Sequence, residues 1–222
     1  MNKLLTSVAT CALFLTACGG GGGGGGGSGG APSITFPDVS NLESPQVLPS
    51  GRASLTGHVV FNDDDGNDDD DGNDIWGDLT IEANFDSGKV DVKANNFAVT
   101  GNLSRGQRTV VTFDRNFTGT LRGKGTITRT DIESTLDGTL RQSVNVRDRR
   151  SGETVTIPWE LHVDSDMDGK VYEKDEKILV RGDVNGSMSA NVSQSFLRQY
   201  NIDPSSVAIP DGQIDGEFYA EE

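Results

Sequence analysis

The strongest constraint on the fold is a series of short segments in which apolar and polar residues alternate with a period of two. Such alternation is typical of β-strands, because successive side chains of a strand point to opposite faces of the sheet. The clearest segment is 78–85, and the turn-like sequence Asp86-Ser87-Gly88 joins it to 89–94. The other expected strands are 52–61, 97–103, 108–114, 117–129, 132–147, 154–163, 177–190 and 212–219.

Eight or nine antiparallel strands in one domain predict a closed barrel or a sandwich. Glycines such as Gly123 and Gly138 stand among the apolar positions of these segments, which indicates strong bending and favours the barrel. Helical periodicity is nearly absent, and its one candidate is 193–200. We therefore expect an all-β fold: an antiparallel eight-stranded (eight or nine) up-and-down β-barrel, lipocalin-like in shape, with one short helix.

The first residues have the pattern of a bacterial lipoprotein signal peptide. Lys3 precedes an apolar stretch, 4–15, which is too short to span a bilayer. Leu15-Thr16-Ala17-Cys18 then fits a lipobox, an aliphatic residue and two small residues before the cysteine that receives the lipid. The sequence predicts a signal peptide over 1–17 and lipidation of Cys18. The alternative is an ordinary secretory signal with a coincidental cysteine.

Residues 18–49 are expected to form a flexible tether that is rich in glycine and then in proline. The barrel domain is expected over 50–222. Three acyl chains on Cys18 would hold the protein firmly in a membrane. Gly19 is not the aspartate that retains some lipoproteins in the inner membrane, so we expect the outer membrane, on its cell-surface or periplasmic face.

The composition excludes several classes of function. The formal net charge is −15, and removal of 1–17 takes away one lysine and no acidic residue, which leaves −16. Such a charge opposes binding to nucleic acid. Cys11 leaves with the signal and Cys18 is acylated, so no disulfide is expected. His58 and His162 lie in strand-like runs, and the chain has no nucleophile, zinc or phosphate-loop motif, so we expect no enzymatic activity.

The order of the segments resembles the β-barrel domain of transferrin-binding protein B-like surface lipoproteins. The resemblance rests on the lipidated glycine-rich tether and on four segments: 48–57 (LPSGRASLTG), 77–85 (GDLTIEANF), 117–123 (FTGTLRG) and 216–222 (GEFYAEE). It implies a barrel displayed at the cell surface. Members of the family usually continue past the last segment into a closing strand, so here the barrel either closes with the strands already present or keeps an open edge. The loops that grip transferrin have no counterpart, so the resemblance implies fold and location more than transferrin binding.

The sharpest local motif matches the D-x-D-x-D-G calcium loop. Asp164, Asp166 and Asp168 take positions 1, 3 and 5, and Gly169 allows the sharp turn at position 6. Carboxylates in that pattern converge on one cation. The sequence therefore predicts one calcium site.

The second half of the motif is less regular. Lys170 would supply its backbone carbonyl, and Asp175 takes position 12, where a glutamate is usual. Strand-like sequences flank the motif in place of helices. The alternative is an acidic hairpin turn, because aspartate and glycine also favour turns.

A second acidic stretch, 62–74, contains eight aspartates. Asn67, Asp69 and Asp71 have part of the calcium-loop spacing, but position 8 of that frame is Asp74 and not an apolar residue. The stretch is either a weak metal site or a solvated loop between the first two strands.

We expect a lipid-anchored β-barrel binding module whose rim loops engage a protein, a metal carrier or a haem carrier. Two alternatives remain: a calcium-stabilised structural or adhesive surface lipoprotein, and a lipocalin-like carrier of a small molecule.

The calcium prediction is tested by calorimetry on the chain from Pro32 onward, with melting curves in calcium and in chelator. Binding in the micromolar to millimolar range is about what single calcium loops show. A double substitution, Asp166→Ala with Asp168→Ala, should abolish it. An absence of heat and of a melting shift would remove the predicted site.

Overall fold

The computed structural model describes residues 34–63, 74–99, 109–113, 116–148, 152, 154–192, 198 and 212–222, and these residues form an all-β structure. The strands are β1 (Arg52–Asp63), β2 (Ile75–Asn84), β3 (Lys89–Val99), β4 (Thr109–Phe113), β5 (Thr118–Gly119), β6 (Leu121–Thr128), β7 (Asp131–Asp148), β8 (Thr154–Lys174), β9 (Lys177–Val192) and β10 (Gly212–Glu221). The all-β prediction is confirmed. The helix predicted at 193–200 lies outside the described residues, apart from Arg198.

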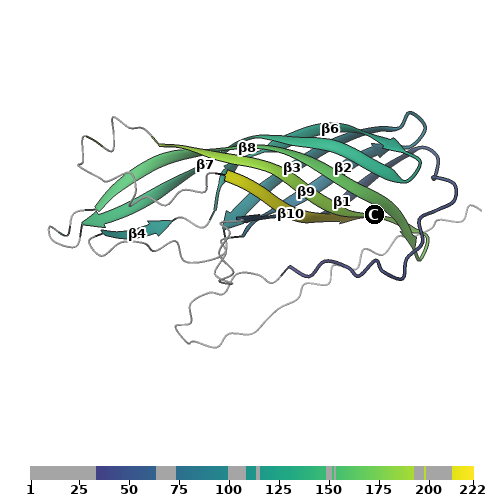
Figure 1. Cartoon of the computed structure of the whole chain (residues 1–222), viewed down its shortest axis with the longest axis horizontal. Coiled ribbons are helices and arrows are strands. Elements are labelled where there is room, and N and C mark those ends of the chain that lie inside the picture. Colours follow the sequence, from purple (N-terminus) through teal and green to yellow (C-terminus); the bar gives the residue numbers. More distant parts are fainter. Residues whose placement is uncertain are drawn as a thin grey trace, which may run out of the picture.

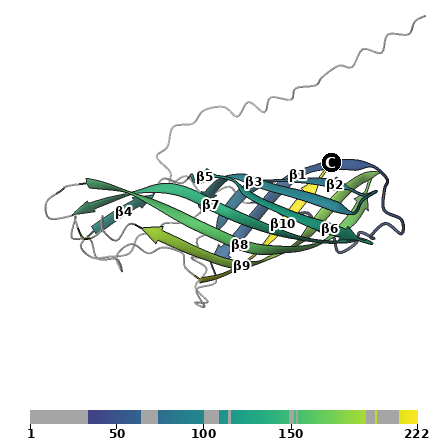
Figure 2. The same ribbon diagram turned by 90° about the horizontal axis from the view of Figure 1, so that it is seen from above.

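Eight of these strands form a ring (Figures 1 and 2). Their order is β7-β6-β3-β2-β1-β10-β9-β8, and β8 pairs back with β7. Every pairing in the ring is antiparallel. β10 is hydrogen-bonded to both β9 and β1, so this strand has no open edge. The eight-strand prediction is therefore confirmed, with β4 and β5 as short additions that pair with β7.

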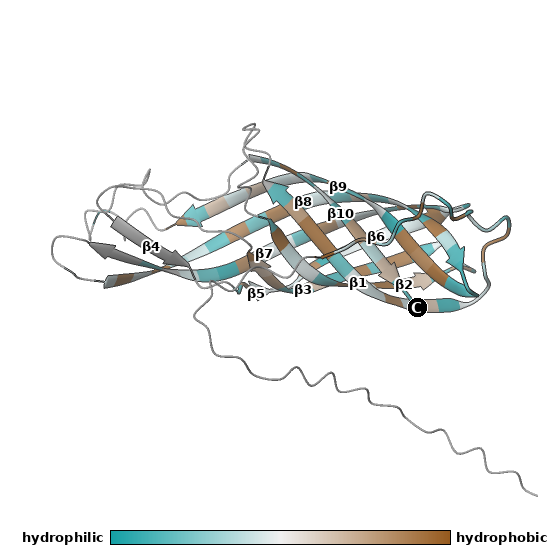
Figure 3. Ribbon diagram, turned by 90° about the horizontal axis from the view of Figure 1, so that it is seen from below, coloured by the Kyte–Doolittle hydropathy of each residue, from teal (hydrophilic) through white to brown (hydrophobic). Residues whose placement is uncertain are grey.

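The alternation that predicted the strands separates an apolar interior from a polar exterior. Figure 3 shows hydrophobic and hydrophilic residues alternating along the strands. The largest fully buried side chains include Phe61, Phe97, Phe218, Leu79 and Ile81. One continuous apolar cluster joins the buried side chains of all eight strands.

Glycines make room for aromatic rings in this interior. Gly169 of β8 lies directly opposite Gly182 of β9, and Gly182 lies opposite Phe218 of β10. A Cβ atom placed on Gly169 would lie 2.7 Å from Cζ of Phe218, which is closer than carbon atoms pack. The Phe218 ring therefore occupies the volume that a side chain at Gly169 would take, whereas a Cβ atom on Gly182 would meet the backbone of Asp168 and Gly169.

The two ends of the ring differ. At one end the turns are short, at 85–88, 129–130 and 175–176. At the other end, β7 and β8 run past the ring as a three-stranded ribbon with β4 (Figure 1). β9 stops opposite Trp159, so the first five residues of β8 lie beyond it.

The packing of Phe218 predicts a large loss of stability on truncation. Phe218→Ala should lower the free energy of unfolding by about 3–5 kcal/mol, because it empties a fully buried site that glycines cannot refill. Urea unfolding of purified protein measures this. The control is Val47→Ala, since Val47 is 83% exposed and should change stability by less than about 0.5 kcal/mol. Equal effects of the two substitutions would contradict the packing described here.

Candidate functional site

The segment predicted to be a calcium loop is part of a strand. β8 continues without interruption to Lys174, and the hairpin turn falls on Asp175 and Glu176, whose φ values are +52° and +66°. The predicted loop conformation over 164–175 is therefore wrong. The physical reason is that D-x-D-x-D also has the period of a strand: Ser165 and Met167 between the aspartates are buried, and they extend the apolar alternation of the ring.

The aspartates of this segment form a row on the outer face of β8. Asp164, Asp166 and Asp168 are all exposed, and Lys170 follows them on the same face. Same-face residues of a strand are spaced by roughly 6.8 Å, so these carboxylates point outward side by side and do not converge. Among the described residues, no three metal-ligating side chains gather in one place. Calcium binding itself stays a prediction.

The row belongs to a larger acidic surface. Asp168 lies directly opposite Glu133 of β7 and Asp183 of β9, and Asp183 lies opposite Glu217 of β10. Four carboxylates thus cross four strands in one line. Like charges directly opposite each other destabilise a sheet. Within the described residues, Glu217 at one end of the line has an ion-pair partner, Arg181, whose Nη2 lies 2.9 Å from Oε2 of Glu217.

The segment before β1 lies against this side of the ring. Arg181 donates a hydrogen bond from Nη1 to the carbonyl of Pro37, at 2.7 Å, and its guanidinium lies 5.7 Å from the centre of the Phe36 ring. The Phe36 ring meets Tyr219 edge-on at 5.6 Å. We call residues 34–50 the strap. This contact could not be predicted from the sequence, because residues 36 and 181 share no motif or spacing.

His58 lies beside these rings, on the outer face. Its ring meets Tyr219 at 5.8 Å and Trp76 at 6.5 Å, both edge-on. Its Nδ1 lies 3.4 Å from Oδ1 of Asp78, whose Oδ2 accepts a hydrogen bond from Asn96. Trp76 is therefore a surface side chain, whereas Trp159 is almost fully buried.

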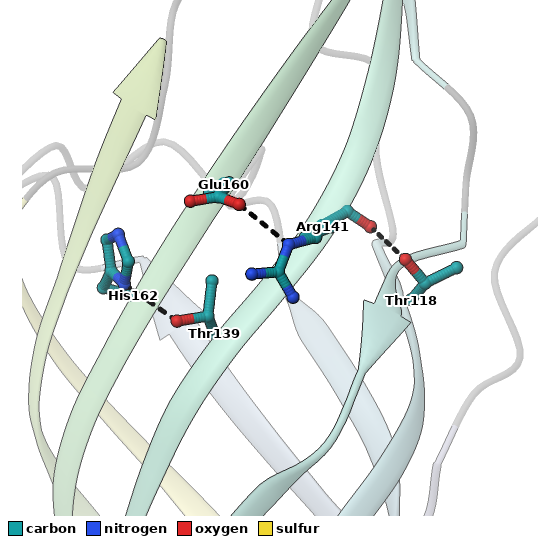
Figure 4. A network of polar contacts seen from close by, with 5 residues as sticks. All are labelled: Thr118, Thr139, Arg141, Glu160 and His162. Carbon is teal, nitrogen blue, oxygen red and sulfur yellow. Dashed lines mark hydrogen bonds and ion pairs between the residues drawn. The ribbon is translucent and has the colours of Figure 1, made fainter.

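A network of polar side chains lies where the ribbon leaves the ring (Figure 4). Arg141 of β7 donates from Nε to Oε1 of Glu160 on β8, at 2.7 Å. The hydroxyl of Thr118 donates to the backbone carbonyl of Arg141 at 3.2 Å. Two residues before Arg141 on β7, Oγ1 of Thr139 lies 2.9 Å from Nδ1 of His162 on β8. The register explains both pairs, because Arg141 is directly opposite Glu160 and Thr139 is directly opposite His162.

This network borders a hollow of about 650 Å³, which we call the ribbon-base hollow. Most of its lining residues are polar, although apolar atoms contribute more of the lining surface. The residues come from five segments: Asn116, Thr118, Arg141, Gln142, Ser143, Pro158, Trp159, Glu160 and Asn191. The volume is within the range of small-molecule sites, about 300–1,000 Å³. The alternation showed that Arg141 and Glu160 would face outward, but the strand register that makes them a pair could not be read from one chain.

The remaining predicted site residues fall elsewhere. Cys18, Asn67, Asp69 and Asp71 lie outside the described residues. Asp74 ends the same acidic stretch, and burial raises the pKa of its carboxyl above the usual value. The pKa of Asp38, in the strap, is lowered mainly by a hydrogen bond from the backbone N–H of Ser40.

Comparisons with known proteins gave no relative for this chain. No family model matches it, and neither does any curated protein or solved structure. In the part of the chain that the structure describes, no helix has the length and apolar character needed to cross a membrane.

The acidic line predicts that one neutralising change should stabilise the ring. Asp168→Asn removes repulsion from both Glu133 and Asp183, so the free energy of unfolding should rise by roughly 0.2–1 kcal/mol at low salt. The gain should shrink in 0.5 M salt, where charges are screened. The matched control is Asp131→Asn, because Asp131 lies opposite Lys170 and loses an attraction. Urea unfolding that shows the same sign for both variants would contradict this account.

Proposed function

We propose that the protein is a lipid-anchored binding module that displays the ribbon end of the ring to a partner outside the membrane. In this proposal the ring is an up-and-down β-barrel of lipocalin-like shape, similar to transferrin-binding protein B-like lipoproteins. The observation that carries the proposal is the ribbon-base hollow, which gathers exposed hydrogen-bonding side chains from β5, β7, β8 and β9 at the base of a projecting ribbon.

The filled interior supports binding on the outside. Buried apolar side chains from all eight strands form one continuous cluster inside the ring, and the rings of Phe97 and Phe218 fill the space beside Gly77 and Gly169. The ribbon-base hollow, in contrast, is bordered by Arg141 and Glu160, whose side chains are 60% and 39% exposed. A ligand can reach these groups without any rearrangement of the core, and this favours display over internal carriage of a small molecule.

The asymmetry of the two ends also supports display. β1, β3 and β9 end, and β2, β6 and β10 begin, at the ribbon end of the ring. Loops that bind partners generally extend from one end of such a rigid scaffold. The strap enters β1 at the opposite end, beside the short turn at 85–88, where the N–H of Gly51 donates to Asp86 at 2.9 Å.

One observation favours the calcium-stabilised alternative. The four carboxylates in line on β7–β10 repel one another, and a divalent cation between two neighbours would relieve that repulsion. Calcium in this reading strengthens the ring and does not define a partner site.

The proposal is tested on cells that express the chain with and without Cys18→Ser. The native chain should sediment with membranes and be cut by protease added to intact cells, whereas Cys18→Ser should stay in the soluble fraction. Cells that display the native chain should bind labelled transferrin or labelled haemoglobin, used as metal-carrier and haem-carrier probes. A double substitution, Arg141→Ala with Glu160→Ala, should lower that binding by at least about tenfold, which equals 1.4 kcal/mol.

Arg122→Ala is the matched control, because Arg122 is an exposed arginine on β6, outside the hollow. Equal membrane attachment of the native chain and Cys18→Ser would contradict the anchor. Probe binding that survives the double substitution would contradict the hollow as the site.

A further inference from the structure

The guanidinium of Arg141 is oriented by one hydrogen bond to Glu160, and the Arg141 side chain is otherwise exposed. Glu160 accepts a hydrogen bond from its Nε at 2.7 Å, and the two residues are directly opposite each other on β7 and β8. In Figure 4 the two terminal nitrogens point away from Thr118 and along β7, toward the side of Thr139. Arg141 and Thr139 are two residues apart on the same strand, so both face outward. Arg141 thus presents its fork of N–H donors to solvent while Glu160 fixes the plane of the group.

A fork of this kind matches a carboxylate, which accepts two parallel hydrogen bonds from the terminal nitrogens. The surrounding charge limits how many negative groups the ligand carries. The chain has a formal net charge of −15, and Asp137 and Asp164 lie opposite each other further along the same two strands. This surface would repel a polyanion strongly, whereas a single carboxylate meets less repulsion and is offset by direct pairing with Arg141.

The rest of the lining favours hydroxyl groups. Asn116, Thr118, Ser143 and Asn191 each offer both a donor and an acceptor, which is the pairing that a hydroxyl group requires. Asn191 lies directly opposite Glu160, so it continues the line of Thr118, Arg141 and Glu160 across four strands.

Apolar anchoring of a peptide has little support in the same hollow. Pro158 is its exposed apolar residue, and Trp159 is only 3% exposed. Protein partners draw most of their affinity from apolar and aromatic anchors in desolvated pockets. The lining therefore suits hydroxyl groups, whether they belong to a free saccharide or to the glycan of a protein partner.

We propose that the ribbon-base hollow binds a saccharide that carries a carboxylate. Arg141 pairs with the carboxylate, Glu160 positions Arg141, and Thr118, Ser143 and Asn191 bind hydroxyl groups of the sugar. This inference rests on the proposed function, because it names the ligand class of the same site.

The experiment is calorimetry or saturation-transfer NMR with the full chain carrying Cys18→Ser, titrated with glucuronate, with glucose and with acetate. Glucuronate should bind more tightly than either glucose, which lacks the carboxylate, or acetate, which lacks the hydroxyl groups. Arg141→Ala should weaken glucuronate binding by about 10- to 100-fold, the range expected for hydrogen bonds to a charged group. Arg141→Lys keeps the charge and loses the fork, so it should also weaken binding, and Arg122→Ala should leave it unchanged.

Glu160→Gln tests the positioning role. It should weaken glucuronate binding and leave the weak binding of acetate nearly unchanged, because only the larger ligand needs the guanidinium in a fixed plane. Circular dichroism of each variant checks that the ring is folded.

Several results would overturn the inference. Glucuronate binding that is equal in the native chain and Arg141→Ala would remove the carboxylate contact, and acetate binding as tight as glucuronate binding would remove the sugar contacts. If glucuronate does not bind, while cells still capture labelled transferrin or haemoglobin through Arg141 and Glu160, the saccharide class is wrong and the proposed function stands. If both binding assays fail, the proposed function fails as well.

Discussion

Closure of the ring is the constraint on which the other features depend. β7 pairs with β8, and β1 pairs with β10, so the backbone hydrogen-bonding groups of the ring strands are satisfied by neighbours on both sides. Closure also fixes which residues face inward, because every strand must keep its apolar face on the same side. The glycines opposite Phe218, the acidic line and the ribbon-base hollow all follow from that register.

The same register decides the chemistry of the outer surface. Residues that are far apart in sequence become direct neighbours, and their charges either attract or repel each other. Arg141 and Glu160 form an ion pair at 2.7 Å, and such an exposed pair contributes little to stability, about 0–1 kcal/mol. Its importance lies in geometry, since it orients a guanidinium at the edge of a hollow. The line of carboxylates through Asp168 has a different effect. Repulsion between these carboxylates lowers the stability of the ring, and they orient no other group among the described residues.

Most of the fold was predictable from the chain because alternation is a local property. The strands expected at 52–61, 89–94 and 177–190 lie inside β1, β3 and β9. The spacing of acidic residues in 164–175 is ambiguous, because it fits both a calcium loop and the outer face of a strand. The burial of Ser165 and Met167 between the aspartates decides for the strand. Arg141, Glu160 and Asn191 could not be grouped from sequence, since their proximity depends on pairings between three strands.

The strap has a consequence for access to the outer face of the ring. Phe36 and Pro37 rest on Arg181 and Tyr219, at the flank of the ring. The strap therefore covers part of the outer face of β9 and β10. A partner that binds this face must first displace the strap, and that breaks the hydrogen bond from Arg181 to Pro37.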